Sequence, residues 1–288
     1  MSAYSYARVE RLYFHSYLTY HIFRRSKCLG DKLEGLVSSF LLSRYEGLDP
    51  GRALGIVKDL FKISHILHDV GKAARIYQDR VFTEPYTELS FKYHEVISAL
   101  VVYEYVKKYL KESLLGVNDL GDLINILSYS TAFAVLMHHE ALRNYVNVLK
   151  RLRSDVIKFL SRVNGFIDDE LMLIDKLLGI EKVSLLDVIR DEKLMDGSKL
   201  GNRFSVFTNI VTDIMGKDRT AFEYLTTVMT SSLQLCDRLA AHLGREVRPE
   251  VKLKKLEREF LRNCFNIKEL KELTEEGLRT LNTLLSKS

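Results

Sequence analysis

The chain has 288 residues, of which 47% are hydrophobic and 28% are charged, and its formal net charge is +5. This composition is that of an ordinary soluble globular protein with room for a sizeable core, and the sequence contains no convincing internal repeat or low-complexity tract. The modest basic excess is compatible with an acidic polymer as substrate but does not establish one.

The three cysteines, Cys28, Cys236 and Cys264, lie far apart and form no CxxC pair. Their spacing argues against a disulfide framework and against a zinc ribbon, and it favours a reducing, intracellular compartment. The longest apolar-rich run without charge, residues 123–137, is shorter than the ~20 residues needed to cross a bilayer. We therefore expect a cytoplasmic protein with no membrane partner.

Apolar residues recur at spacings of three and four along most of the chain and strand-like alternation is scarce, which predicts an all-α fold. The first well-marked helix covers residues 48–69. Asp49 is suited to its N-cap and Pro50 to its first helical position, and Gly71 is suited to stop it.

Three further helices are predicted downstream. One covers residues 88–113 and starts near Ser90; the next covers residues 118–140, is the most apolar, and is expected at the centre of the molecule. A later helix covers residues 218–242, with Asp218 as its cap.

No strong linker divides the chain, so we predict a single domain over residues 1–288. Within it, residues from about 141 to 202 form an elaborated helical middle that could serve as a peripheral insertion or lid. Pro249 marks a break, and residues from about 249 to 288 are expected to form C-terminal helices.

The most informative pattern is a set of histidines on apolar helices: the doublet His68–Asp69, the single His94, and the doublet His138–His139. One histidine on a helix is more often a hydrogen-bonded core or surface residue than a ligand. Burying all of these groups without partners would cost several kcal/mol, and a metal supplies a common partner. Imidazole and carboxylate ligands suit Mn, Fe, Co, Ni or Zn.

The doublets themselves point to two ions. Neighbours on a helix point ~100° apart, so they rarely converge on one ion, but at a helix end they can serve two. Asp69 is the natural bridge because a carboxylate has two oxygens. Two ions ~4 Å apart clamp the attacking and leaving oxygens of a phosphodiester and activate a bound water.

Four motifs together resemble the HD superfamily of metal-dependent phosphohydrolases, and most closely the stand-alone HD nuclease of type I CRISPR interference, which lacks the helicase half. They are "HDVGKAARIYQ", with the aromatic-Gln pair Tyr77 and Gln78, then "YHEVISAL", "MHHE" and "CDRLAAH". One departure is Glu140, because the family usually has glycine after its histidine pair.

The resemblance implies an HD-domain helical bundle and a centre of two divalent ions (Mn, Mg, Ni, Co, Fe or Zn). One ion would be held by His21, His68, Asp69 and Asp237. The other would be held by Asp69 with His94, His138 and His139.

Three neighbouring residues keep two interpretations each. Lys72 either steadies a phosphate as a catalytic group beside Asp69 or is a solvated lysine at a helix end. His65 either supports a ligand or, as we favour, is a core histidine, and Glu95 either orients a ligand or is a surface acid.

The first histidine ligand has two candidates. His15 and His21 differ by about 240° on one helix, so they are unlikely to share a site. The neighbours of His21 form an apolar stripe, whereas those of His15 are mixed, with Arg8 and Arg11 among them. We therefore predict His21 as the ligand and His15 as a boundary or surface histidine, and the family resemblance agrees with an early-helix histidine.

The function implied by the resemblance is a nuclease that cuts single-stranded DNA, and conceivably RNA, in CRISPR interference against foreign DNA. The sequence contains no GxxxxGK[ST] loop, so a separate helicase subunit and an RNA-guided surveillance complex are the expected partners. The alternatives are an HD phosphohydrolase acting on nucleotides or another small phosphate ester, and a non-catalytic binding subunit with a relic site. Three basic runs, at residues 24–27, 150–153 and 252–255, either follow a nucleic-acid backbone or are solvated helix faces.

Overall fold

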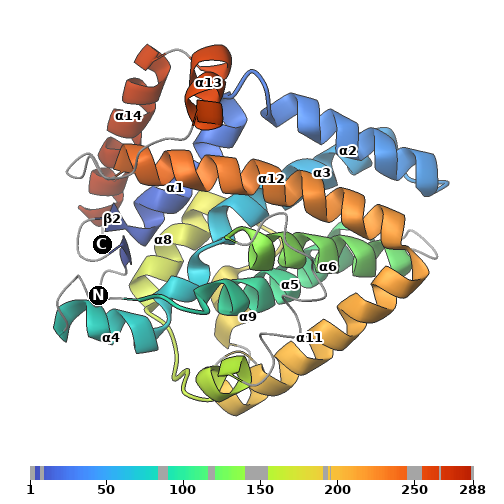
Figure 1. Cartoon of the computed structure of the whole chain (residues 1–288), viewed down its shortest axis with the longest axis horizontal. Helices are drawn as coiled ribbons and strands as arrows, with labels where there is room; N and C mark the ends of the chain where they lie inside the picture. The colour runs from blue at the N-terminus through green and yellow to red at the C-terminus, as the bar shows by residue number, and fades with distance from the viewer. Residues whose placement is uncertain are drawn as a thin grey trace.

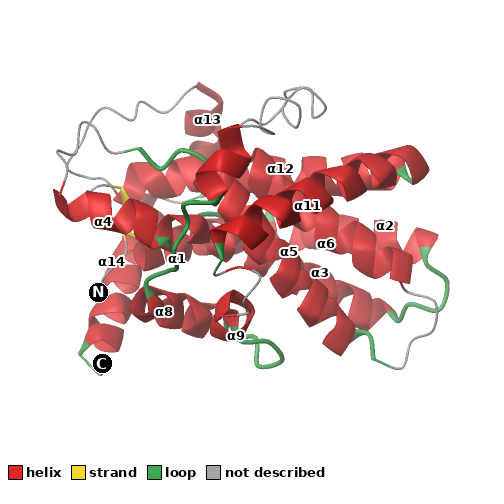
Figure 2. Cartoon of the chain, turned by 90° about the horizontal axis from the view of Figure 1, so that it is seen from below, coloured by secondary structure: helices red, strands yellow, loops and turns green. Residues whose placement is uncertain are grey.

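The computed structural model describes residues 4–6, 10–83, 90–115, 121–139, 155–190, 194, 196–244, 255–265 and 267–286. Over these ranges the predicted all-α fold is confirmed: the helices fill the molecule, and the short antiparallel pair β1 (Tyr4–Tyr6) and β2 (Glu10–Arg11) precedes them (Figures 1 and 2). None of the described helices combines the length and the apolar character that a membrane span requires.

Five helices surround the candidate site and form the centre of the bundle: α1 (Leu12–Arg25), α3 (Pro50–Leu67), α5 (His94–Ser113), α6 (Gly121–Met137) and α12 (Arg219–Gly244). Helices α5 and α6 pack against each other, and α12 crosses the molecule in contact with α1, α3 and α6 (Figure 1). Their contact faces are apolar and buried, so the core holds the helix ends that carry the histidines at fixed positions.

The remaining described helices enclose this centre. They are α2 (Gly30–Arg44), α4 (Arg75–Thr83), α8 (Asp168–Leu178), α9 (Leu185–Arg190), α11 (Gly197–Lys217), α13 (Lys255–Cys264) and α14 (Ile267–Leu285). Helix α8 contacts α1 and α3, so this part of the predicted middle segment packs on the bundle. Residues 140–154, which include Glu140 and the basic run at 150–153, lie outside the described residues, and the division into domains stays a prediction.

Helix α3 begins as its sequence predicts. The side chain of Asp49 accepts a hydrogen bond of 2.8 Å from the backbone N–H of Arg52, and Pro50 occupies the first turn. The helix ends earlier than expected, at Leu67, and a 3-10 turn, η1 (Val70–Ala73), follows. The doublet His68–Asp69 therefore lies in the junction between two helices.

Helices α5 and α12 show one difference and one agreement. Helix α5 begins at His94 rather than near Ser90, because Tyr93 has φ 69°, a left-handed conformation that a helix cannot continue through. Helix α12 begins at Arg219, and the carboxylate of Asp218 accepts a hydrogen bond from the N–H of Ala221 as predicted for its cap.

The prediction that the cysteines form no disulfide is wrong for one pair. Cys28, which follows α1, is bonded to Cys264 at the end of α13, across a sequence separation of 236 residues. The prediction from spacing failed because spacing along the chain does not show which distant residues the fold brings together. Cys236 is buried and free.

Candidate metal centre

Two groups of four side chains meet at one point of the helix bundle. The first is His15, His68, Asp69 and Asp237, and the second is Asp69, His94, His138 and His139. Within each group the potential ligand atoms all lie within 4.8 Å of one another. Asp69 belongs to both, so the partition into two groups around a shared carboxylate follows the sequence prediction except at the first histidine.

The first group joins α1, α12 and the junction after α3. Nε2 of His15 lies 2.9 Å from Oδ1 of Asp237, and Nε2 of His68 lies 3.4 Å from the same oxygen. Both Nε2 atoms lie 3.5 Å from Oδ2 of Asp69. Four donor atoms from three segments thus face a common point.

The second group joins the start of α5 and the end of α6 to the other oxygen of Asp69. Oδ1 of Asp69 lies 2.9 Å from Nε2 of His94 and 3.8 Å from Nε2 of His138. Nε2 of His139 lies 3.2 Å from Nε2 of His94. Asp69 therefore presents Oδ2 to the first group and Oδ1 to the second.

The histidines are oriented by hydrogen bonds from their outer nitrogens. Because a carbonyl oxygen only accepts, each Nδ1 bonded to one carries the proton, and the lone pair of Nε2 faces the centre. The carbonyl acceptors are those of His65 for His68 at 2.9 Å, Phe91 for His94 at 2.6 Å and Val135 for His138 at 2.5 Å.

This arrangement leaves buried polar atoms that a cation would satisfy. Nε2 of His68, Nε2 of His138 and Oδ1 of Asp69 are buried and accept no hydrogen bond. Because Nδ1 of His94 holds the proton of that ring, the 2.9 Å between its Nε2 and Oδ1 of Asp69 separates two lone pairs. Such a contact is unfavourable unless a cation or proton lies between the atoms, so the donor set fits divalent metal ions.

The charge states also suit metal ligation. Burial opposes ionisation of Asp69, but the Lys72 ammonium and the nearby histidines outweigh it and hold the carboxyl pKa well below its usual range. Burial likewise opposes ionisation of Asp237, but its neighbours His15 and His68 outweigh it and hold the carboxyl pKa well below its usual range. Burial lowers the pKa of His138 well below its usual value and that of His139 to about 4. Anionic carboxylates and neutral imidazoles are the ligating forms.

Gly71 explains how η1 approaches α5 closely enough to bring the two groups together. A Cβ at this position would lie 2.3 Å from the carbonyl oxygen of His94 and 2.9 Å from Oγ of Ser98. The N–H of Gly71 donates to that Oγ at 2.8 Å. Only glycine allows this contact, which holds Asp69 beside His94.

The aromatic-Gln pair ties two ligand-bearing segments to α4. The buried amide of Gln78 donates to the carbonyl oxygen of Lys72 at 2.5 Å, and the hydroxyl of Tyr77 donates to the carbonyl oxygen of Lys92 at 2.7 Å. The first bond holds η1 and the second holds the segment that leads into α5. Both residues therefore act on the positions of ligands rather than on chemistry.

The three ambiguous residues take distinct positions. Lys72 is 8% exposed, and its Nζ lies 2.7 Å from Oδ2 of Asp69, so it lies at the centre rather than in solvent. His65 packs its ring 4.5 Å from that of Phe23, as expected of a core histidine, while its carbonyl orients His68. Glu95 lies 3.2 Å from Nδ1 of His94.

The geometry does not favour His21 as the first histidine ligand, because it is His15 that lies in the first group. His15 is 1% exposed and faces Asp237 and Asp69, whereas the ring of His21 stacks 4.2 Å from that of Tyr17, outside both groups. Burial, followed by the charge of Arg25, lowers the pKa of His21 to about 4.

The difference from the prediction has a local cause. Helix α1 begins at Leu12 and Arg11 belongs to β2, so Arg11 does not share a helical face with His15, while Arg8 lies outside the described residues. Residues 12–19 are all buried, because α1 contacts α3, α8, α12 and α14 on different sides. When other helices pack around a helix, the polarity of the residues on each of its faces does not show which of two histidines points to the site.

One residue of the site was missed by the sequence reasoning. Glu10 is 1% exposed, and its Oε1 lies 3.1 Å from Nδ1 of His15. Burial alone would lower the pKa of His15, but Glu10 and Asp237 outweigh it and raise that pKa to about 10. Glu10 lies in β2, ahead of the helix and outside the recognised motifs, so no pattern pointed to it.

The members of the centre differ in exposure. His15, His68 and His138 are at most 1% exposed, whereas His94 is 5% and Asp237 9% exposed. Among the members of the centre, His139 of the second group is the exposed residue in the part of the chain that the structure describes.

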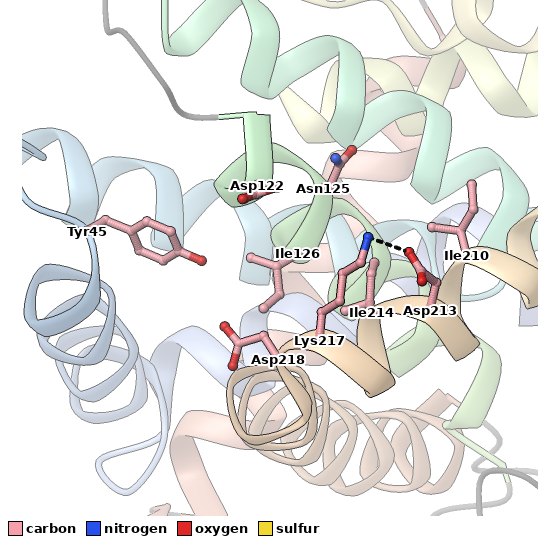
Figure 3. A pocket seen from close by; sticks show the side chains of 9 residues that line it. All are labelled: Tyr45, Asp122, Asn125, Ile126, Ile210, Asp213, Ile214, Lys217 and Asp218. Atoms are coloured by element: carbon pink, nitrogen blue, oxygen red, sulfur yellow. Dashed lines mark ion pairs between the residues drawn. The ribbon is translucent and has the colours of Figure 1, made fainter.

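A separate pocket of about 290 Å³ lies elsewhere, where Tyr45 and the start of α6 meet the end of α11 (Figure 3). Asp122 at the start of α6 lines it, whereas His138 follows the last residue of that helix, so the length of α6 separates the pocket from the centre. Two of its three acids are paired: Asp213 with Lys217 at 3.0 Å, and Asp218 with an arginine of α2 at 2.8 Å. None of the lining residues belongs to either ligand group.

No model of a protein family matches the chain. It is similar to the CRISPR-associated endonuclease Cas3-HD of Methanocaldococcus jannaschii, with 31% identity over 144 residues. The aligned part is 49% of this chain and 52% of that protein, so the chain spans about half the length of the curated relative it matches. The resemblance inferred from the four motifs is thereby confirmed: over about half of its length, this chain is similar to a stand-alone HD nuclease of CRISPR interference.

Proposed function

We propose that the chain is a metal-dependent nuclease that hydrolyses phosphodiester bonds in single-stranded DNA during CRISPR interference. The observation that carries the proposal is the position of Asp69, which offers one oxygen to each of two ligand groups. A carboxylate shared in this way suits two ions acting on one phosphodiester.

The ligand side chains would form two ion-binding positions. His15, His68 and Asp237 would hold one ion, with Oδ2 of Asp69. The histidines His94, His138 and His139 would hold the other, with Oδ1 of Asp69. Divalent ions bound there would supply an activated water and stabilise the charge that develops on the phosphodiester.

Lys72 is a cation in direct contact with the centre. Its Nζ contacts Oδ2 of Asp69 at 2.7 Å and lies 5.6 Å from the centre of the Phe91 ring. We propose that the Lys72 ammonium would hold a phosphate oxygen of a substrate bound at the centre. Lys72 is a point charge that supplements the ions, so its contribution should be smaller than theirs.

The substrate and partners are inferred from the relative and the sequence. The relative is described as a CRISPR-associated endonuclease. This chain contains no GxxxxGK[ST] loop, so a separate helicase subunit and an RNA-guided surveillance complex would supply the opened strand in the cytoplasm.

The test is cleavage of an end-labelled single strand and of a blunt duplex by chelator-treated, dialysed protein, with and without Mn²⁺ or Mg²⁺. We expect metal-dependent cutting of the single strand in preference to the duplex. Asp69→Asn should abolish it, while Asp213→Asn, an exposed acid in the pocket of Figure 3, should not change it.

Two results would contradict the proposal. Full activity in the chelated protein would exclude the metal role. Hydrolysis of nucleotides without cleavage of either strand would favour a small-molecule phosphohydrolase, for which the same ligands would serve.

A further inference from the structure

The carboxylate behind His15, that of Glu10, is buried in the core. Glu95 also lies 3.2 Å from Nδ1 of His94, but its side chain is 20% exposed, so water screens its charge. His68, His94 and His138 direct their outer N–H to backbone carbonyls. Nδ1 of His15 instead faces a buried carboxylate at 3.1 Å. A full negative charge behind the ring makes Nε2 a stronger ligand than a carbonyl dipole does.

The contact between Glu10 and His15 depends on a glycine beside Glu10. Gly244, the last residue of α12, lies against Glu10, and a Cβ there would come 2.1 Å from Oε1 of that carboxylate. Helix α12 also carries Asp237, which contacts the inner nitrogen of His15 at 2.9 Å. One helix therefore supplies a ligand and also leaves room for the carboxylate behind a second one.

The strand that carries Glu10 is itself anchored. Arg11, the next residue of β2, pairs with the fully buried Glu170 of α8 at 2.6 Å, and Glu170 also accepts a hydrogen bond of 2.8 Å from the N–H of Tyr13. These bonds fix the junction between β2 and α1. Glu10 and His15 are thereby held in register across that junction.

We propose that Glu10 is a positioning residue that strengthens cation binding by the first group, His15, His68, Asp69 and Asp237, and has little effect on the second. The inference rests on the proposed metal centre but not on the nature of the substrate. Removing a carboxylate behind a ligating histidine typically weakens metal affinity by about 10- to 100-fold.

The experiment is a calorimetric titration of chelator-treated protein with Mn²⁺, together with the Tm of the metal-free protein. For Glu10→Gln, which keeps the size and loses the charge, we expect one of two binding events to weaken by about 10- to 100-fold and the other to persist. Gly244→Ala keeps the charge of Glu10 but pushes its carboxylate away from His15, so it should weaken the same binding event.

Glu170→Gln is the matched control, because it removes a buried carboxylate from the same junction without touching a ligand. It should lower the Tm and leave both Mn²⁺ affinities unchanged, which separates a role in stability from a role in binding. The proposal is overturned if Glu10→Gln binds both ions as the wild type does, if it weakens both equally, or if the wild type binds none. Wild-type protein that binds two ions but cuts no nucleic acid would overturn the proposed function and leave this inference standing.

Discussion

The two halves of the candidate centre share Asp69 and differ in almost everything else. The half around His15 and His68 is buried except at Asp237, which is 9% exposed; Asp237 adds a carboxylate, and Glu10 lies behind His15. The half around His94 adds only imidazoles to the shared oxygen and reaches the surface at His139.

This difference suggests a division of roles. A site with more negative charge holds a divalent cation more tightly. A site with neutral ligands and an exposed histidine binds more weakly, and it is where a phosphodiester can reach an ion. We therefore expect sequential binding of two ions, the first in the Asp237 half and the second in the His139 half.

The largest effect should come from the residue that both halves share. Asp69→Asn removes the bridging charge, so we expect loss of both ions and of about 10³-fold or more in activity. Lys72→Ala should cost about 10- to 100-fold with both ions still bound, because the lysine only supplements their charge. Cleavage rates and metal content of the two folded variants check this; a Lys72 variant less active than the Asp69 variant would reverse the assigned roles.

The first half should fail selectively when its histidine is removed. We expect His15→Ala to lose one ion and at least about 10²-fold in activity, since Asp237 and Glu10 are then left facing each other in the core. His21→Ala is the control on the same helix, and both ions should stay bound. Metal analysis by mass spectrometry after dialysis distinguishes the two, and an inactive His21 variant that has lost an ion would restore the rejected assignment.

The second half offers a finer comparison between neighbours. His138 is buried and His139 is exposed, although both face the same point. His138→Ala should lower the Tm of the metal-free protein, because it leaves a cavity worth about 2–4 kcal/mol, as well as weakening the second ion. His139→Ala should weaken that ion by about 10-fold without changing the metal-free Tm. Equal losses of Tm in the two variants would argue against the exposed position of His139.

The smallest effect on the centre should come from the disulfide. Cys28–Cys264 closes a loop of 236 residues, and the chain-entropy estimate for such a loop is about 5 kcal/mol. The double variant Cys28→Ser with Cys264→Ser should therefore melt about 10 °C lower, yet bind both ions normally, since neither cysteine belongs to a ligand group. Melting curves and a Mn²⁺ titration test both parts, and an unchanged Tm would show that the bond contributes no stability.

Much of this centre could be predicted from the sequence because its ligands lie in short motifs at the ends of periodic helices. The doublets lie at the junction after α3 and at the end of α6, and Asp69, the predicted bridge, belongs to both ligand groups. The start of α3 followed from Asp49 and Pro50, whose local chemistry acts over one turn.

The features that could not be predicted from the sequence depend on packing between distant segments. Distinguishing His15 from His21 required knowing that α1 starts at Leu12 and is surrounded by other helices. Glu10 reaches the centre through the turn from β2 into α1, and the disulfide joins residues from opposite ends of the chain. No periodicity encodes such contacts, because they arise only when distant segments are packed together.

The most direct test is a crystal of the protein soaked in Mn²⁺, with anomalous scattering used to locate the ions. We predict two anomalous peaks on either side of Asp69, one among His15, His68 and Asp237 and the other among His94, His138 and His139. The peak in the first half should appear at the lower Mn²⁺ concentration. A single peak, no peak, or a peak at His21 would contradict the account.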